Sequence, residues 1–332
     1  MKELRAGDLV VYVCNDEKTM GDEAANRVLN EVRYAHSRGL TPVLWLMAAP
    51  SGFEFYEALV TQARASADIS RMLDGIDIYQ FDDYPISRES GRFPVTFRAL
   101  LESRLIDPLK REVRITPNWH PLELTGDENS DDVVMARYSE SLMSVLDSPR
   151  HYVVEVKGIG MDGHWGFHGG ETPLDAPARI MRVPMNAENV AQQMIDWPEY
   201  FQETSDVPAN AVSCNVALFM RADVIVDVVP QQSKEYSVLA AYGTDEVIGA
   251  IPSSAAKQHE NAVSFVTQSA GRALLEYRER AEEGLSPALS EGTMERLKRI
   301  WEDPEHPKRA EKSIELMRKI LGQLGMVDGK AG

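Results

Sequence analysis

Short apolar runs alternate with longer amphipathic stretches over most of the chain. The run Leu9–Cys14 (LVVYVC) is typical of a buried strand, and the segment 22–38 after it spaces its apolar residues as a helix does, up to Gly39. The same criteria predict further strands at 42–47, 76–81, 113–116, 151–157, 224–229 and 263–266, and helices at 54–67, 97–105, 130–146 and from Ser233 onward. Strands that alternate with helices predict an α/β fold, with a doubly wound, mostly parallel sheet and helices on both faces.

The C-terminal part of the chain has a different pattern. From about residue 278 it is highly charged, and its helical stretches are interrupted by glycine and proline. We therefore expect an α/β domain over residues 1–277 and a helical C-terminal extension over residues 278–332. The extension would pack on the domain or on a partner subunit.

Membrane and disulfide signals are lacking. No apolar stretch is long enough for a membrane span, and the N-terminal segment has no apolar core of a secretory signal. The two cysteines, Cys14 and Cys214, are too few for a disulfide framework, and each lies in a strand-like apolar run. We expect two buried free thiols in a cytoplasmic protein.

The charge balance narrows the choice of partners. Fifty-two acidic residues against 35 basic ones give a formal charge of −17 at pH 7. A field of this sign repels nucleic acids and anionic lipids, so we expect a small-molecule partner and neither nucleic acid nor membrane. An anionic substrate would need its own local cationic pocket. The acidic surface and the helical extension are compatible with a homo-oligomer.

Ligands of parallel sheets bind beyond the C-terminal ends of the strands, which directs attention to the residues placed there. Asp82 and Asp83 directly follow the strand 76–81. Their side chains point in different directions, so one of them can face a ligand while the other caps or pairs. A carboxylate beside a buried strand end has a raised pKa, which suits a general base. The alternative is a pair of turn-forming aspartates before Pro85.

A glycine-rich loop, residues 158–170, follows the strand 151–157 and carries Asp162, His164 and His168. Its glycines allow the backbone to approach a ligand closely. A GxGxxG pattern begins at Gly158, but the residues after it are a poor helix start for a dinucleotide site. A zinc site from the three titratable side chains would need a helix that these glycines interrupt. A structural turn is a further alternative. We prefer an active-site loop, without metal or cofactor.

Two further strand ends carry candidate binding groups. Ser51 and Gly52 precede the helix 54–67, where backbone N–H groups can bind an anion, although the Gly-Lys-Ser/Thr ending of a P-loop is lacking. Ser51 could equally be a helix cap. Lys234 follows the strand 224–229 and could supply a positive charge, or be a solvated lysine.

Taken together and in this order, these segments resemble the superfamily of glucosamine-6-phosphate isomerases/deaminases and 6-phosphogluconolactonases, as a divergent member. The segment 158–164 is similar to the family's G-x-G-x-D-G-H loop, and residues 81–84 are similar to its M-D-E-Y motif. Residues 207–222 resemble the deaminase segment V-P-x-x-A-L-T-x-G-V-G-T-L-x-x-A. Lys234 fits the following G-x-x-K, and residues 251–259 fit S-x-L-Q-x-H. The resemblance implies a modified Rossmann-like fold and favours the deaminase branch.

The resemblance also implies roles for the candidates. Asp82 would be the base that moves a proton between C2 and C1 through an enediol or enolamine. His164, oriented by Asp162, would assist opening of the sugar ring. Lys234 and Ser51 would hold the sugar phosphate, with Gly52 and Gly160 in the same binding loops.

The chain departs from the family pattern in three places. Gly169 stands where the deaminases carry a glutamate that partners the histidine, His168 stands at their asparagine, and the nearest carboxylate is Glu171. The phosphate loop differs from the family's G-G/S-T-P, and no cation stands near 191–193, where an arginine is expected. Asp83, His168 and Glu171 are therefore additional candidates.

The sequence thus predicts an aldose–ketose isomerase or deaminase acting on an amino-sugar phosphate or a related sugar phosphate. A lactonase-like hydrolase of the same superfamily is one alternative. A catalytically silent module that binds a sugar phosphate is another.

Overall fold

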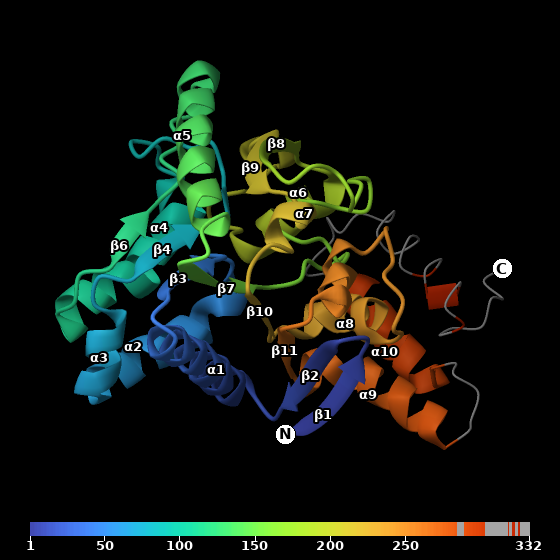
Figure 1. Ribbon diagram of the computed structural model, residues 1–332. Helices are drawn as coiled ribbons and strands as arrows, with labels where there is room; N and C mark the ends of the chain where they lie inside the picture. The colour runs from blue at the N-terminus through green and yellow to red at the C-terminus, as the bar shows by residue number, and fades with distance from the viewer. Residues whose placement is uncertain (284–288, 303–317, 319–320, 323–324, 326–332) are drawn as a thin grey trace.

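The computed structural model describes residues 1–283, 289–302, 318, 321–322 and 325. An eight-stranded sheet forms its centre (Figure 1). In spatial order the strands are β1 (Lys2–Ala6), β2 (Leu9–Cys14), β11 (Ala262–Thr267), β10 (Val224–Val229), β7 (His151–Lys157), β3 (Thr41–Leu46), β4 (Asp77–Gln80) and β6 (Asn118–His120). All neighbours are parallel except β1 and β2. The predicted mostly parallel sheet is confirmed.

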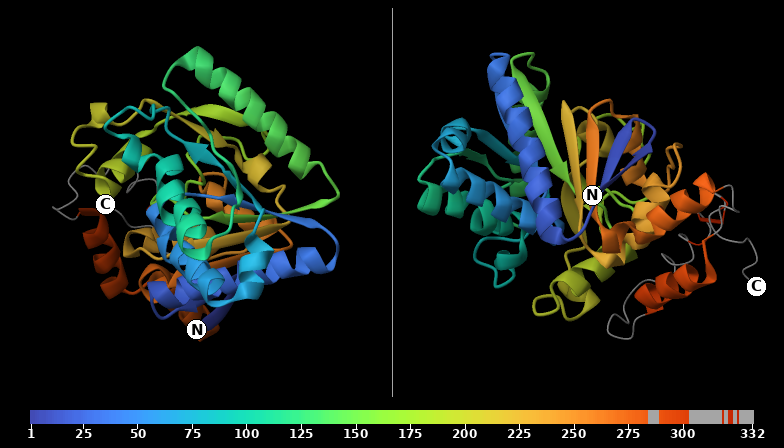
Figure 2. Two further views of the ribbon diagram at one scale, coloured as in Figure 1. Left: turned by 90° about the vertical axis from the view of Figure 1, so that its left-hand side faces the viewer. Right: turned by 90° about the horizontal axis from the view of Figure 1, so that it is seen from below.

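Ten α-helices are described around the sheets. They are α1 (Glu17–Ser37), α2 (Phe53–Ala65), α3 (Ala67–Leu73), α4 (Phe97–Leu101), α5 (Glu128–Leu146), α6 (Ala187–Asp196), α7 (Val216–Phe219), α8 (Glu235–Tyr242), α9 (Gln268–Glu282) and α10 (Glu291–Glu302). Figure 2 shows them from two further sides.

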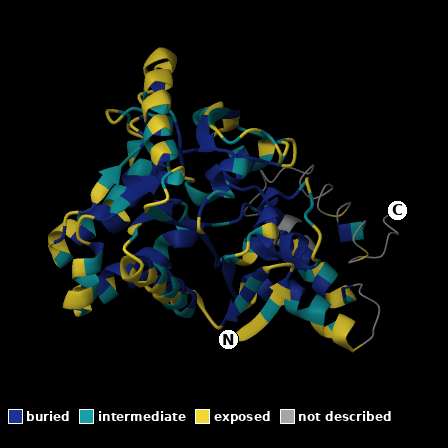
Figure 3. Cartoon of the chain, in the orientation of Figure 1, coloured by how far each residue is buried: buried dark blue, intermediate teal, exposed yellow. Residues whose placement is uncertain are grey.

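The side chains of β7 show that helices cover both faces of the central sheet. Tyr152 donates a hydrogen bond to Glu31 of α1. Lys157, five positions on and therefore on the opposite face, lies 3.5 Å from Asp227 of β10, which accepts a hydrogen bond from Tyr242 of α8. The doubly wound arrangement is thus confirmed. Most of the buried hydrophobic residues form one large core cluster (Figure 3), and a second, small cluster consists of Val95, Met194, Phe201 and Val207.

A second, three-stranded antiparallel sheet lies beyond the first. It consists of β5 (Asp82–Asp83), β9 (Asn210–Cys214) and β8 (Ile180–Pro184), with β9 in the centre. Of these strands only β9 was indicated in the sequence, by the strand-like run around Cys214. β5 and β8 were not predicted, because both are short and β5 is made of two aspartates. Only Phe81 separates β4 from β5, so the chain passes directly from the central sheet into the second sheet, to which Asp82 belongs.

One predicted strand and the predicted start of one helix were wrong. The predicted strand 113–116 is not a strand: a π-helical turn runs to Val113, and Arg114 adopts a left-handed conformation with φ of 65°. The pairing strand is β6, which begins only at Asn118. Helix α1 starts at Glu17, five residues earlier than predicted, because Asp16 caps it by accepting a hydrogen bond from the backbone of Thr19.

The division at residue 277 stays a prediction. Helix α9 runs through that position to Glu282, and α10 follows in the described part of the chain. Most of the residues after Glu302 lie outside the described residues.

Both cysteines are free and buried, as predicted. None of the helices in the described residues has the length and apolar composition needed to cross a membrane.

Candidate active site

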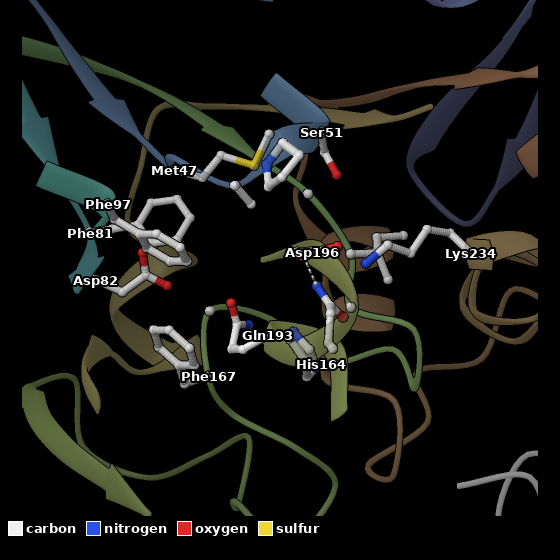
Figure 4. A pocket seen from close by; sticks show the side chains of 17 residues that line it. Met47, Ser51, Phe81, Asp82, Phe97, His164, Phe167, Gln193, Asp196 and Lys234 are labelled. Atoms are coloured by element: carbon white, nitrogen blue, oxygen red, sulfur yellow. Dashed lines mark hydrogen bonds between the residues drawn. The ribbon is translucent and has the colours of Figure 1, made fainter. Parts of the chain in front are cut away.

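A pocket opens beyond the C-terminal ends of β3, β4, β7 and β10 (Figure 4). It is lined by Met47, Ala49, Pro50, Ser51, Phe81, Asp82, Phe97, Gly158, Ile159, Gly160, His164, Gly166, Phe167, Gln192, Gln193, Asp196 and Lys234. Side chains from four strand ends, the glycine-rich loop and helix α6 therefore meet in one place. Its position agrees with the rule that ligands of parallel sheets bind at the C-terminal edge.

Asp82 presents a buried carboxyl group to this pocket. The residue is 2% exposed, and its Oδ1 atom has no hydrogen-bond partner. Burial, and secondarily the charge of Asp83, raise the pKa of Asp82 well above its ordinary value. Phe81, Phe97 and Phe167 form apolar walls near it (Figure 4). A carboxyl group in such surroundings is suited to exchange a proton with a bound molecule.

Asp83 is not part of the pocket lining, and its side chain accepts hydrogen bonds from neighbouring segments of the chain. Its carboxylate accepts hydrogen bonds from the backbone of Tyr84, Phe97 and Arg98 at 2.8, 2.8 and 2.9 Å, and from the amide of Gln80 at 3.0 Å. Burial raises the pKa of Asp83 to about 6, while these four bonds act in the opposite direction. The turn-forming alternative therefore describes Asp83, whereas Asp82 lines the pocket.

We expect Asp83→Ala to lower the free energy of unfolding by about 3 kcal/mol or more. Four donors would lose their acceptor: the side-chain amide of Gln80, the backbone N–H of Tyr84, and two backbone N–H groups at the start of α4. Urea unfolding followed by circular dichroism measures the change. Asp8→Ala, at an exposed residue, is the control and should leave the midpoint almost unchanged. Equal stability of the two variants would contradict the assigned role.

Asp162 and His164 form a buried pair at the other side of the pocket. Asp162 Oδ1 lies 2.6 Å from His164 Nδ1 and accepts the backbone N–H of His164 at 3.2 Å. Burial acts to raise the pKa of Asp162, but the charge and hydrogen bonds of His164 outweigh it, so that the pKa is lowered. The carboxylate fixes the ring orientation and leaves Nε2 of His164 available to the pocket.

Gly160 is required by the closeness of this histidine ring. A Cβ atom at Gly160 would lie 2.1 Å from ring atoms of His164. The backbone N–H of Gly160 also donates to the carbonyl of His164 at 2.9 Å. The glycine-rich sequence thus lets the loop fold tightly around the histidine. Gly52 lies beside the pocket, where a Cβ atom would approach the hydroxyl of Tyr56 at 2.9 Å.

His168 and Glu171 do not belong to the pocket lining. His168 is fully buried behind the loop, and its backbone pairs with that of Trp165. Glu171 is exposed and interacts with Asn186 at 3.4 Å. Glu171, the carboxylate nearest in sequence to the family's glutamate position at Gly169, therefore does not line the pocket together with His164.

His168 should make the stability of the protein depend on pH. Burial lowers its pKa from 6.5 to about 4, so that the folded state holds it neutral. As the pH falls from 6.5 towards 4, His168 binds a proton in the unfolded chain but not in the folded one. The free energy of unfolding therefore decreases by about 3 kcal/mol over this range. His168→Gln should flatten the unfolding free energy over this range. An unchanged pH profile would contradict the prediction.

The metal and dinucleotide alternatives find no support in the described residues. No group of three or more His, Cys, Asp or Glu side chains there is arranged to hold a metal ion. The chain that follows Gly158, Gly160 and Gly163 forms turns, and the next helix in the described segment, α6, begins only at Ala187. A dinucleotide loop would have to open directly into a helix.

Lys234 lies in a 3₁₀ turn before α8 and reaches the pocket from the side opposite Asp82 (Figure 4). Burial lowers its pKa, and the negative charge of Asp196 is the largest influence in the other direction. Ser51 donates a hydrogen bond to Gln231 at 2.9 Å and does not cap α2.

Sequence reasoning missed the contribution of α6 to the pocket. This helix presents Gln192, Gln193 and Asp196, and Gln192 contacts Asp196 at 3.5 Å. A signal was available, because the helix carries Asn189, Gln192 and Gln193 on its buried side. Buried polar side chains on an amphipathic helix often face a ligand or a polar network.

Several proteins of known activity are similar to this chain, although no family model matches it. The glucosamine-6-phosphate deaminase of Streptococcus uberis is 22% identical over 265 residues, which cover 80% of this chain and 99% of the relative. That of Streptococcus suis is also 22% identical, with the same coverage.

Solved structures agree with the observed fold. A monomeric glucosamine-6-phosphate deaminase superposes with a TM-score of 0.63 at 16% identity, over 79% of this chain and 98% of that one. The 6-phosphogluconolactonase of Trypanosoma brucei has a TM-score of 0.59 at 13% identity, over 82% and 99% of the two chains. In sequence the protein described here is thus similar to these deaminases at low identity, and it shares the fold of both the deaminase and the lactonase structures.

Proposed function

We propose that this protein is an aldose–ketose isomerase or deaminase that acts on an amino sugar or a related sugar. The relatives are named for a phosphorylated amino sugar, glucosamine 6-phosphate. The observation that carries the proposal is the buried carboxyl group of Asp82, whose Oδ1 atom has no hydrogen-bond partner, in the same pocket as His164, which Asp162 orients. Proton abstraction from carbon needs a positioned, desolvated base, and ring opening needs a group that can exchange a proton with the ring oxygen.

In the proposed reaction, His164 donates a proton to the ring oxygen while water takes the proton of the C1 hydroxyl. The bond between C1 and the ring oxygen breaks, and an open-chain aldehyde forms. Asp82, in its ionised form, then takes the C2 proton of the open-chain sugar. The electron pair of the C2–H bond forms a C1–C2 double bond and O1 takes a proton from water, which gives an enediol, or an enolamine when C2 carries nitrogen. Asp82 then returns its proton to C1 while O2 or the C2 nitrogen loses a proton to water, which leaves a ketose or a ketose imine. Water hydrolyses the imine to release ammonia.

The shared fold also supports a second candidate, a lactonase-like hydrolase, because the lactonase of Trypanosoma brucei superposes over most of the chain. In that reaction His164 would activate water through Nε2, and Asp82 would have little part. A silent module would bind a sugar without turnover.

Direct turnover tests the proposal. The protein is incubated with glucosamine, glucosamine 6-phosphate and a panel of other aldoses, and ketose and ammonia are measured together. Both products are expected with an amino sugar if deamination accompanies isomerisation, and ketose alone indicates a plain isomerase. Hydrolysis of 6-phosphogluconolactone without ketose formation would favour the lactonase. Cytoplasmic location and self-association stay predictions.

A further inference from the structure

Helix α10 lies beside the part of the chain that carries Lys234 (Figure 1). Lys234 ends the 3₁₀ turn Gln232–Lys234, and α8 begins at the next residue, Glu235. The side chain of Lys234 reaches the pocket, whereas that of Glu235 is directed to α10. These two neighbouring residues thus connect the pocket with the C-terminal helix.

The contact between α8 and α10 is a buried ion pair. Arg296 donates to both carboxylate oxygens of Glu235, from Nη2 at 2.6 Å and from Nε at 3.2 Å. The Glu235 side chain is fully buried, and that of Arg296 is 18% exposed. An arginine that donates two hydrogen bonds to one carboxylate fixes the direction as well as the distance between the partners. The pair therefore holds the first turn of α8 in one place relative to α10.

Helix α10 is itself attached to the rest of the fold. Glu276 of α9 accepts hydrogen bonds from the backbone N–H of Ser290 at 2.7 Å and from the hydroxyl of Thr293. Leu297 of α10 has no exposed surface, and α9 packs along α8. Polar and apolar contacts thus set the position of α10, and with it that of Arg296.

The turn that carries Lys234 depends on the start of α8. A 3₁₀ turn has poorer hydrogen-bond geometry than an α-helix. The backbone N–H of Lys234 donates to Gln231 at 3.0 Å, and its carbonyl accepts the hydroxyl of Ser237 at 2.9 Å. Without Arg296, the buried carboxylate of Glu235 would lose both charge-assisted bonds, which is strongly unfavourable. The first turn of α8 would then shift to bring the carboxylate to water, and Lys234 would move with it.

We propose that Arg296 is a positioning residue, which acts through Glu235 to hold the ammonium group of Lys234 where it contacts a bound sugar or sugar phosphate. The C-terminal helix thus contributes to substrate affinity, although Arg296 does not line the pocket. The proposal rests on the proposed function, since it assumes that the pocket binds a sugar.

A double-mutant cycle tests the proposal. Arg296→Gln, Lys234→Met and the combination are prepared in the full chain with Asp82→Asn, which prevents turnover, and binding of glucosamine and of glucosamine 6-phosphate is measured by calorimetry. We expect Arg296→Gln to weaken binding of the preferred sugar about tenfold, and to have almost no effect in the Lys234→Met background. An unchanged affinity, or an equal loss in both backgrounds, would overturn the proposal.

Two further variants separate positioning from a loss of structure. Arg296→Lys keeps the charge but not the two parallel hydrogen bonds, and we expect an intermediate loss of affinity. Arg299→Gln removes one charge at an exposed position of the same helix and should bind as the parent chain does. With Asp82 intact, Arg296→Gln should raise KM and change kcat by less than about twofold, because a binding contact is lost and the reacting groups stay in place. A fall in kcat with unchanged KM would contradict the positioning role.

Chemical labelling of Lys234 needs neither ligand nor turnover. Reductive methylation followed by mass spectrometry should modify Lys234, which is 5% exposed, several times faster in Arg296→Gln than in the wild type. Lys257 donates hydrogen bonds to the backbone carbonyls of Thr244 and Glu246 and is the internal control, which should react equally in both chains. Equal labelling of Lys234 in the two chains would overturn the proposal.

Turnover by the wild-type chain distinguishes the two proposals. If the wild type forms no ketose, but Arg296→Gln binds sugar more weakly and exposes Lys234 to labelling, the proposed function fails and the positioning role stands. If the wild type forms ketose and Arg296→Gln binds sugar as tightly as the parent chain, the positioning role fails and the proposed function stands.

Discussion

Asp82→Asn is expected to lower the rate of sugar isomerisation by about a thousandfold, the range typical of a lost general base. Asparagine keeps the shape of the side chain and cannot accept a proton from carbon. The measurement is ketose formation together with exchange of the C2 hydrogen for deuterium from solvent. Asp8→Asn, at an exposed position, is the control for a change of one charge.

The Asp82→Asn variant also distinguishes between the two candidate reactions, isomerisation and lactone hydrolysis. Lactone hydrolysis through His164 could survive without Asp82, whereas isomerisation could not. Full isomerase activity in the variant would contradict the role given to Asp82.

The pH dependence of the wild-type isomerisation rate should reflect the raised pKa of the Asp82 carboxyl group. Because burial raises the pKa of Asp82 well above the ordinary 3.8, the group becomes an ionised base only at higher pH. The rate should therefore rise with pH through a value above that of an exposed aspartate, and fall as the pH is lowered through it.

Gly160→Ala is expected to reduce kcat for a ring-form sugar by about a hundredfold. The new Cβ atom would lie 2.1 Å from the His164 ring, so the ring must leave its position beside Asp162. A displacement of about 1 Å in a catalytic group can cost two orders of magnitude in rate. Steady-state kinetics measures the loss, and calorimetric binding shows whether the pocket still forms.

Gly91→Ala is the matched control, because a Cβ atom at Gly91 meets nothing within 4 Å. A Gly160→Ala variant that stays fully active would show that the position of His164 is unimportant. Unchanged exchange at C2 of an open-chain sugar, with slow turnover of the ring form, would assign the loss to ring opening.

Much of the central sheet could be predicted from the sequence. The predicted bounds of β2, β7 and β10 agree with the observed ones, since strands buried on both faces are mostly apolar along their whole length. The glycine-rich loop was also recognisable, because the short spacing between Asp162 and His164 makes their contact a local one.

Short strands were much harder to predict. β5 pairs with β9, which is more than 120 residues away in the chain. Two aspartates have low intrinsic preference for a strand, and only the partner strand makes them one. The same pairing turns Asp82 towards the pocket and leaves Asp83 to the backbone of α4.

By itself, the sequence determined the α/β class, the strand ends that carry Asp82, His164 and Lys234, and the likeness to sugar-phosphate enzymes. These properties follow from local hydrophobic periods and from short motifs, which do not depend on distant segments. Only the tertiary structure decided which aspartate faces the pocket, and that Asp196 and two glutamines stand near Lys234. Such groups meet through packing of α6 against the strand ends, and no pattern along the chain encodes that distance.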